Sequence, residues 1–166
     1  MDVANVMGSR PDGWWRDRAG AALRMHGELV SLAASGRAIP PGETAAQDAG
    51  ETPAQEPGFV MVLEGAAKAA ATRIAAAPAA EGSGKVSVVL APKSGDDAIV
   101  AVIRDLPGRR VVVTADRELR ARVAAAGATA VGPGWLLAQL HPLASRASGH
   151  PARSTGRPHF PSCPAH

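Results

Sequence analysis

The stretch FVMVL at residues 59–63 is a short, uninterrupted apolar run. A run of this length is typical of a strand buried on both faces, as in parallel sheets. Two similar runs follow, VSVVL at residues 86–90 and RVVVT at residues 110–114. Together the three runs predict a valine-rich sheet at the centre of the protein.

Helical patterns alternate with these runs, over residues 14–35, 96–106 and 118–126. Residues 128–131 predict a last short strand, and a helix follows from residue 135. Asp12 is placed to cap the first helix, and residues 1–6 read as the end of a strand. The alanine-rich segment 66–77 fits a helix or a loop equally well. This order predicts an α/β fold with three α/β/α layers and a mostly parallel central sheet.

The chain of 166 residues is long enough for one domain with a substantial core. We expect this domain to span residues 1–142. Residues 37–57 lack periodicity and hold a Pro-Pro-Gly turn and four acids, which predicts a solvated insertion. Residues 143–166 are rich in Pro, Ser, Arg and His and predict a disordered tail.

The net charge of +3 comes from the three arginines in the predicted tail. The body of the chain is therefore formally neutral, and charge alone does not indicate a nucleic-acid partner. The single Cys163 excludes a disulfide framework or a cysteine zinc site within one chain. No apolar run approaches the roughly 20 residues that cross a bilayer, so we expect a soluble, cytoplasmic protein without a membrane partner.

Polar residues follow each predicted strand. Because ligand sites in open parallel sheets lie beyond the carboxyl ends of the strands, these residues are the candidates for chemistry. They are Asp2 and Asn5, then Glu64, then Ser94, Asp96 and Asp97, and finally Thr114 and Asp116. Clustered carboxylates repel one another and bind hard cations such as Mg²⁺ or Mn²⁺, which activate water for attack on phosphorus. We therefore predict a catalytic metal site made of Asp2, Asp96, Asp97 and Asp116.

Each acid also has a purely structural interpretation. Ser94 and Asp97 match the spacing of a capping box, and Asp116 is placed to cap the next helix. Asp2 fits an ordinary terminal residue, and Glu64 fits a solvated turn. The case for a site therefore depends on the shared placement of these residues rather than on any one of them.

Four segments carry a resemblance to a known family: residues 2–6 (DVANV), 8–15 (GSRPDGWW), 94–97 (SGDD) and 114–119 (TADREL). Their order and strand placement resemble the PIN-like NYN domains of the YacP-like group, over roughly residues 1–142. The resemblance implies Mg²⁺- or Mn²⁺-dependent cleavage of RNA, with Asp2, Asp96 or Asp97, and Asp116 as metal ligands. Asn5 would orient water or phosphate, and we place Arg10, Ser94, Thr114 and Arg117 among the substrate-binding residues.

The first strand departs from the family pattern, because only Met1 precedes Asp2 where the family has several apolar residues. One explanation is that the start codon has been placed too late. The other is a weakened sheet centre with a charged amino group beside the metal site. We expect the first explanation to hold.

Two other functions remain open. Similar chains are often labelled NTP pyrophosphohydrolases, which would use acid-bound Mg²⁺ on a phosphoanhydride, although the glutamate-dense helix of a Nudix site is absent. The short first strand also fits a catalytically weakened module that binds RNA or a protein. Trp14 and Trp15 lie among arginines and suit base stacking, although burial of at least one ring is the commoner arrangement.

Overall fold

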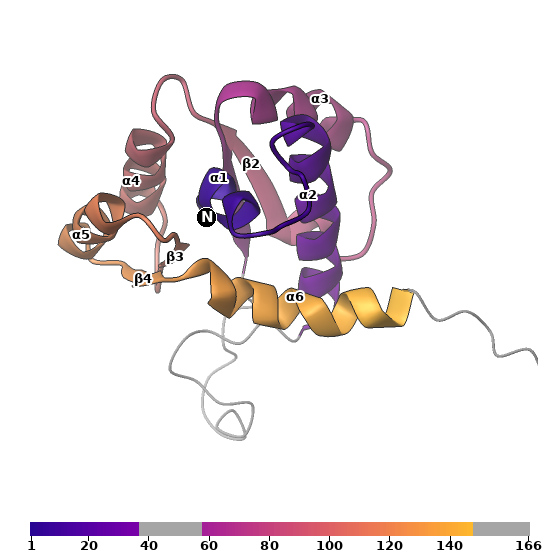
Figure 1. Ribbon diagram of the computed structural model, residues 1–166. Helices are drawn as coiled ribbons and strands as arrows, with labels where there is room; N and C mark the ends of the chain where they lie inside the picture. Colours follow the sequence, from indigo (N-terminus) through magenta and orange to yellow (C-terminus); the bar gives the residue numbers. More distant parts are fainter. Residues whose placement is uncertain (37–57, 148–166) are drawn as a thin grey trace, which may run out of the picture.

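The computed structural model describes residues 1–36 and 58–147 (Figure 1). The predicted insertion at residues 37–57 lies outside the described residues, as does the chain from residue 148 onward. The described part is a mixed α/β structure with short parallel strand pairs, so the predicted α/β class is confirmed.

The elements follow the predicted order closely. They are α1 (Val3–Gly8), α2 (Arg18–Ala34), β1 (Phe59–Leu63), η1 (Gly65–Ala69), α3 (Ala70–Ala75), η2 (Ser83–Lys85), β2 (Val86–Leu90), α4 (Gly95–Asp105), β3 (Val111–Val113), α5 (Arg117–Ala125), β4 (Thr129–Val131) and α6 (Pro133–Ala147). The segment left open at residues 66–77 forms a 3₁₀ turn and a short helix. The helix α6 continues to Ala147, past the domain boundary predicted at residue 142.

The strands pair in parallel, β1 with β2 and β3 with β4. Met1 and Asp2 lie between these two pairs. The backbone N–H of Val62 in β1 donates to the Met1 carbonyl (3.2 Å), and the Asp2 N–H donates to the Val113 carbonyl in β3 (3.2 Å). The first two residues of the chain therefore connect both strand pairs through backbone hydrogen bonds.

The prediction of strand through residue 6 was wrong, because the backbone becomes helical directly after Asp2. The Asp2 carboxylate accepts a hydrogen bond from the Asn5 N–H (3.1 Å) and so caps α1. Val3, Val6 and Met7 fill the core from one face of this helix. The spacing of Asp2 and Asn5 is therefore the signal of a helix start.

The predicted cap of the first long helix was also wrong. Asp17 caps α2, with its carboxylate accepting from the Gly20 N–H at 2.7 Å. A Cβ at Gly20 would lie 2.0 Å from an Asp17 oxygen, so the cap requires glycine there. Asp12 instead accepts from the Trp14 N–H (3.1 Å) within the preceding loop.

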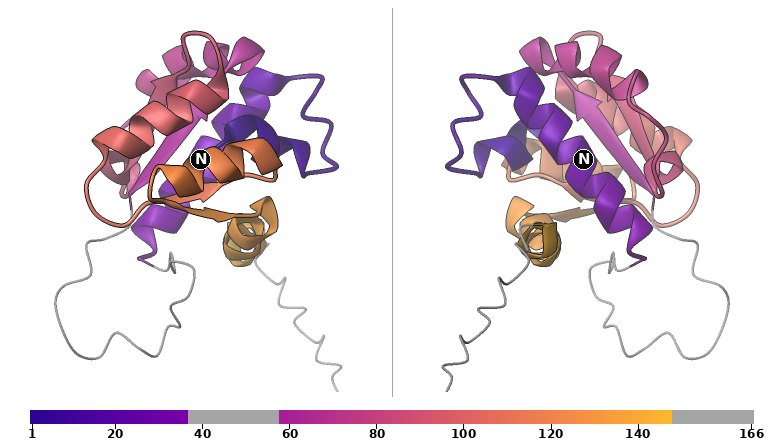
Figure 2. Two further views of the ribbon diagram at one scale, coloured as in Figure 1. Left: turned by 90° about the vertical axis from the view of Figure 1, so that its left-hand side faces the viewer. Right: turned by 90° about the vertical axis from the view of Figure 1, so that its right-hand side faces the viewer.

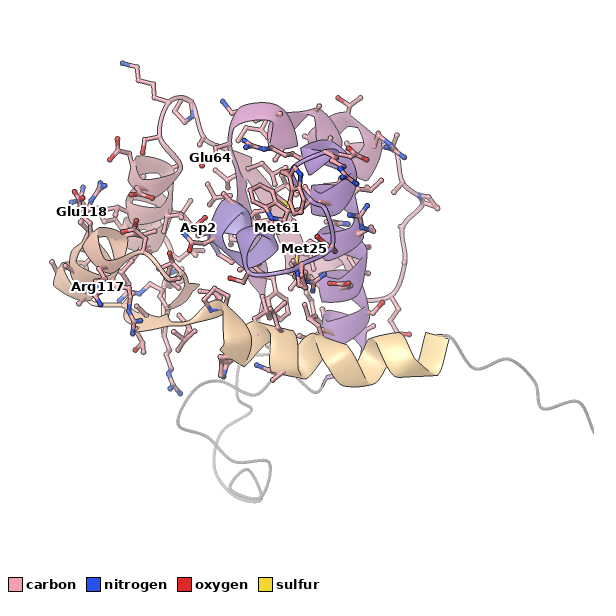
Figure 3. The ribbon with its side chains drawn as sticks, in the orientation of Figure 1. Asp2, Met25, Met61, Glu64, Arg117 and Glu118 are labelled. Atoms are coloured by element: carbon pink, nitrogen blue, oxygen red, sulfur yellow. The ribbon has the colours of Figure 1, made fainter. Side chains whose placement is uncertain are left out.

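Two hydrophobic clusters lie on opposite faces of the strands. Met61 and Leu63 of β1 point into the cluster that contains Met25 of α2, and Val62 points into the cluster formed with α4 and α5. Figure 2 shows α4 over one face of β1 and β2 and α2 over the other, and Figure 3 shows Met25 and Met61 meeting between α2 and β1. This alternation follows from the two-residue period of a strand.

The strand β2 is less buried than its sequence predicted. Ser87 is exposed, and the Leu90 side chain is 48% exposed. Within the described residues β2 pairs with β1 alone, so it forms an edge strand, and the prediction of full burial was wrong for this strand. None of the helices in residues 1–36 and 58–147 has the length and apolar character to cross a membrane.

Candidate acidic site

Asp2 is the most deeply placed acid of the candidate site, with a relative exposure of 8%. One carboxylate oxygen accepts from the Asn5 N–H, and the other accepts from the Asn5 side-chain amide (2.8 Å) and the Thr114 hydroxyl (3.0 Å). Burial of an ionised carboxylate is costly unless such donors surround it. Asp2 is therefore a built feature of the fold rather than a terminal residue exposed to solvent.

Thr114 connects this carboxylate to the next acid. Its side chain is fully buried at the end of β3, and its oxygen also accepts from the Asp116 N–H (3.2 Å). The Asn5 amide oxygen accepts from the Ala115 N–H (3.2 Å). Residues from two segments that carry the family resemblance, 2–6 and 114–119, thus form one hydrogen-bonded network.

This network changes the roles expected for Asn5 and Thr114. Both were predicted to contact substrate. The Asn5 amide is bonded to Asp2 and to Ala115, and the Thr114 hydroxyl is buried between Asp2 and Asp116. The structure gives both residues a positioning role, because their polar groups serve the protein's own hydrogen bonds.

Asp116 follows β3 and caps α5, as its structural interpretation predicted. Its Oδ1 accepts from the Leu119 N–H at 2.8 Å. The residue is exposed, and among the described residues Oδ2 has no hydrogen-bond partner. One oxygen of Asp116 therefore caps the helix while the other keeps its capacity to accept, so that capping and ligand binding are compatible.

Asp96 lies in the first turn of α4, where the charges of the other acids act on its carboxyl group. Partial burial raises the pKa of its carboxyl, and the nearby Asp116, Asp2 and Glu64 raise it further, against the opposing charge of Arg122. Like charges disfavour ionisation of a neighbouring carboxyl. Asp96 is therefore placed in a field to which three separate segments contribute negative charge.

Glu64 is the acid that sequence reasoning left out of the site. Its Oε2 accepts from the Gly95 N–H (2.9 Å), which places the carboxylate over the start of α4 beside Asp96. A Cβ at Gly95 would lie 2.6 Å from that oxygen, so the approach requires glycine. Figure 3 shows Glu64 and Asp2 near the centre of the molecule. Its position directly after β1 was the available signal.

Asp97 and Ser94 lie differently from their predicted site roles. Asp97 is exposed, and its carboxylate pairs with the Arg122 guanidinium of α5. Ser94 caps α4 by accepting from the Asp97 N–H at 3.5 Å, as the capping interpretation expected. Asp97 is not among the groups that shift the pKa of Asp96. The structure brings Asp96, not Asp97, toward Asp2 and Asp116.

Neither of the two predicted substrate-binding arginines forms an ion pair with an acid of the site among the described residues. Arg10 forms a two-contact ion pair with Glu28 of α2, at 3.0 and 2.6 Å. This ion pair connects the loop after α1 with α2. Arg117 is exposed on α5, and Figure 3 shows it with Glu118 on the outer side of that helix.

The amino group of Met1 lies near the charge of Asp2. It is buried and donates to the Val60 carbonyl at 2.5 Å. Burial lowers the pKa of this amine to about 6, although the neighbouring Asp2 charge acts in the opposite direction.

The donor set suits a hard cation in its chemistry. Mg²⁺ and Mn²⁺ prefer carboxylate oxygens, and Asp2, Glu64, Asp96 and Asp116 supply only these. Within residues 1–36 and 58–147, however, no three such side chains lie close enough to hold one ion as they stand. A cation held by three of these carboxylates would therefore require their side chains to move closer together.

Comparisons with known protein families, with curated proteins and with solved structures found no match to this chain.

Proposed function

We propose that the protein is a metal-dependent phosphodiesterase that cleaves RNA, with Asp2, Glu64, Asp96 and Asp116 as its acidic site. The observation that carries the proposal is the link from the Asp2 carboxylate through the Thr114 hydroxyl to the Asp116 N–H. It joins two acids that lie far apart in the sequence. Burial, and then the charges of Asp116, Asp2 and Glu64, raise the pKa of the Asp96 carboxyl, which connects Asp96 and Glu64 to the same group of acids.

The proposed architecture is a three-layer, PIN-like α/β/α domain. If Met1 and Asp2 are counted as a first strand, the backbone hydrogen bonds give the strand order 3-2-1-4-5. The order reverses between this first strand and β3. Open α/β sheets bind ligands at such a reversal, beyond the carboxyl ends of the strands. Asp2 and Asp116 come from the two strands that flank this reversal.

The chemistry proposed for the site needs no protein nucleophile. A bound Mg²⁺ or Mn²⁺ would neutralise the carboxylates, lower the pKa of a bound water and stabilise the leaving oxygen. The protein holds Asp2 rigidly through Asn5 and Thr114, and it holds Glu64 through the Gly95 N–H. Asp96 is partly exposed and Asp116 is exposed, so a ligand in solvent can reach both.

Asp116→Asn provides the sharpest test. Asparagine is as good a helix cap as aspartate, so α5 keeps its start while the site loses a charge. Glu118→Gln is the matched control, because it removes the same charge two residues away on an exposed position of α5. Labelled single-stranded RNA is incubated with each protein in Mn²⁺ and in EDTA. We expect cleavage by the wild type and by Glu118→Gln in Mn²⁺ only, and loss of at least 100-fold in Asp116→Asn, roughly 2.7 kcal/mol of transition-state stabilisation.

The other two functions are outcomes of the same experiment. Release of pyrophosphate from nucleoside triphosphates, with RNA left intact, would replace the nuclease with an NTP pyrophosphohydrolase. Absence of metal-dependent turnover on both substrates by folded protein would leave a binding module.

A further inference from the structure

The loop between α1 and α2 presents an aromatic ring to solvent. Trp15 is 57% exposed, more than Leu90 at 48% or Leu106 at 39%, the other large apolar side chains exposed in the described part of the chain. Exposure of a tryptophan ring forgoes the large stabilisation that its burial provides. Trp14, by contrast, packs against the core.

The loop is held in one conformation at several points. The Trp14 N–H donates to Asp12, and the Arg16 N–H donates to the Gly13 carbonyl (3.0 Å), with Gly13 at a φ of +74° that glycine adopts without strain. Asp17 caps α2, and the ion pair between Arg10 and Glu28 anchors the start of the loop. A loop already ordered in this way loses little entropy when a ligand binds.

One guanidinium group lies near each of the two rings. The Arg16 guanidinium lies 6.0 Å from the centroid of Trp15, and that of Arg18 lies 5.3 Å from Trp14. The rings meet edge to face at 6.4 Å. Among residues 1–36 and 58–147, neither arginine has a carboxylate within ion-pair distance. An exposed ring beside uncompensated guanidinium groups matches the platforms that stack bases of single-stranded nucleic acids.

The loop also lies beside the end of α1 that is opposite to Asp2. A Cβ at Gly8, the last residue of α1, would lie 3.7 Å from the Trp14 ring. Asp2 caps the other end of this helix of six residues, which is about 9 Å long. At roughly 3.4 Å per nucleotide in a stacked strand, about three nucleotides match the length of this helix.

We infer that Trp15 stacks on a nucleobase of single-stranded RNA, and that Arg16 contacts a neighbouring phosphate, while the strand continues along α1 toward Asp2. This inference rests on the proposed function for its ligand. It names a contact that determines which form of RNA the protein accepts, because only unpaired bases offer a free face for stacking.

The test measures binding without turnover. Fluorescein-labelled single-stranded RNA is titrated with full-length protein in EDTA, and affinity is followed by fluorescence anisotropy. We expect Trp15→Leu to weaken binding by about tenfold, within the range for loss of one stacked base, and Trp15→Phe to retain most of the affinity. Leu106→Ala is the matched control for an exposed apolar side chain, and it should bind as the wild type does. Thermal unfolding confirms that each variant is folded.

Salt dependence separates the two contacts. Arg16→Gln should reduce the slope of log affinity against log salt by about 0.7, the value for one phosphate on a single strand, whereas Trp15→Leu should leave the slope unchanged. Arg104→Gln, which removes an exposed arginine of α4, is the control for charge.

Three results would overturn the inference: wild-type affinity in Trp15→Leu, no binding of single-stranded RNA by the wild type, or tighter binding of duplex RNA. The proposed function is judged separately, by Mn²⁺-dependent hydrolysis of bis(p-nitrophenyl) phosphate in the wild type and in Asp116→Asn. RNA binding that depends on Trp15 without any such hydrolysis would support the platform and reject the enzyme. Hydrolysis with a Trp15→Leu variant that binds RNA normally would do the opposite.

Discussion

The hydroxyl of Thr114 donates a hydrogen bond to the carboxylate of Asp2 across 3.0 Å, and both side chains are buried. The two residues are 112 positions apart in the sequence. The bond holds the start of the chain, where the Asp2 N–H donates to the Val113 carbonyl, at the end of β3. Because Thr114 also accepts from the Asp116 N–H, a single hydroxyl sets the spacing between two acids.

Thr114→Val tests this bond. Valine has the shape of threonine but leaves a lone pair of the buried Asp2 carboxylate and the Asp116 N–H without a partner. We expect the free energy of unfolding to fall by about 1.5–3 kcal/mol, the range for a bond to a charged group. Thr114→Ser keeps the hydroxyl and should lose less. Urea denaturation measures both, and a valine variant as stable as the wild type would contradict the role assigned to the bond.

Asp96→Asn should stabilise the protein in EDTA near neutral pH. The pKa of Asp96 is raised above its ordinary value of 3.8, so the folded state holds the proton more tightly than the unfolded state does. The stability that this proton provides is present below pH 3.8 and is lost as pH rises through the folded-state pKa. The advantage of asparagine should therefore grow with rising pH and then level off.

The measurement for Asp96 is the melting temperature in EDTA between pH 4 and pH 7. Asp97→Asn is the control, since it lies in the same turn of α4 but pairs with Arg122. We expect no comparable gain there. A melting temperature that fell in Asp96→Asn at pH 7 would show that the surrounding acids do not repel its carboxylate.

Mn²⁺ should raise the melting temperature of the wild type, because an ion that binds only the folded state stabilises it by about 2.7 kcal/mol at 100 times its Kd. Glu64→Gln should reduce this shift while keeping an acceptor for the Gly95 N–H. Glu81→Gln removes an exposed glutamate between α3 and η2 and should keep the full shift. An equal shift in both variants would remove Glu64 from the metal site.

Arg110 is expected to stabilise the fold at the start of β3, whereas the acids follow the end of this strand. Its guanidinium donates to the carbonyls of Ile103 and Leu106 near the end of α4, and to the carbonyl of Gly127 after α5. Helix ends leave such carbonyls without partners. Arg110→Met should lower the free energy of unfolding by about 1–3 kcal/mol, whereas Arg104→Met, on the exposed side of α4, should change it by less than about 0.5 kcal/mol. Chemical denaturation at neutral pH compares the two, and equal losses would argue against a specific role for Arg110.

Local signals predicted most of the elements correctly. The apolar runs at residues 59–63 and 86–90 are β1 and β2, and the helices expected near residues 96–106 and 118–126 are α4 and α5. The caps at Ser94 and Asp116 also follow from neighbouring residues alone. Each of these features depends on contacts within a few positions, which spacing in the sequence records directly.

Features that depend on distant residues were missed or misplaced. Arg10 was predicted to bind substrate, because the sequence does not show that it pairs with Glu28 of α2 in the folded chain. Asp97 and Asp96 are adjacent in the sequence, yet the helix turns one toward Arg122 and the other toward the acids. Glu64 gained its place because Gly95, from another segment, allows the close approach.

The sequence by itself determined most of the alternation of strands and helices, the caps of α4 and α5 and the placement of acids after the strands, because these follow from local periodicity and local hydrogen bonding. Only the tertiary structure decided that Asp2 pairs with Thr114, that β2 lies at an edge, and which acids share one field. Those outcomes depend on which strands lie side by side. That choice is made by burial and backbone pairing between residues far apart in the chain, which no short stretch of sequence encodes.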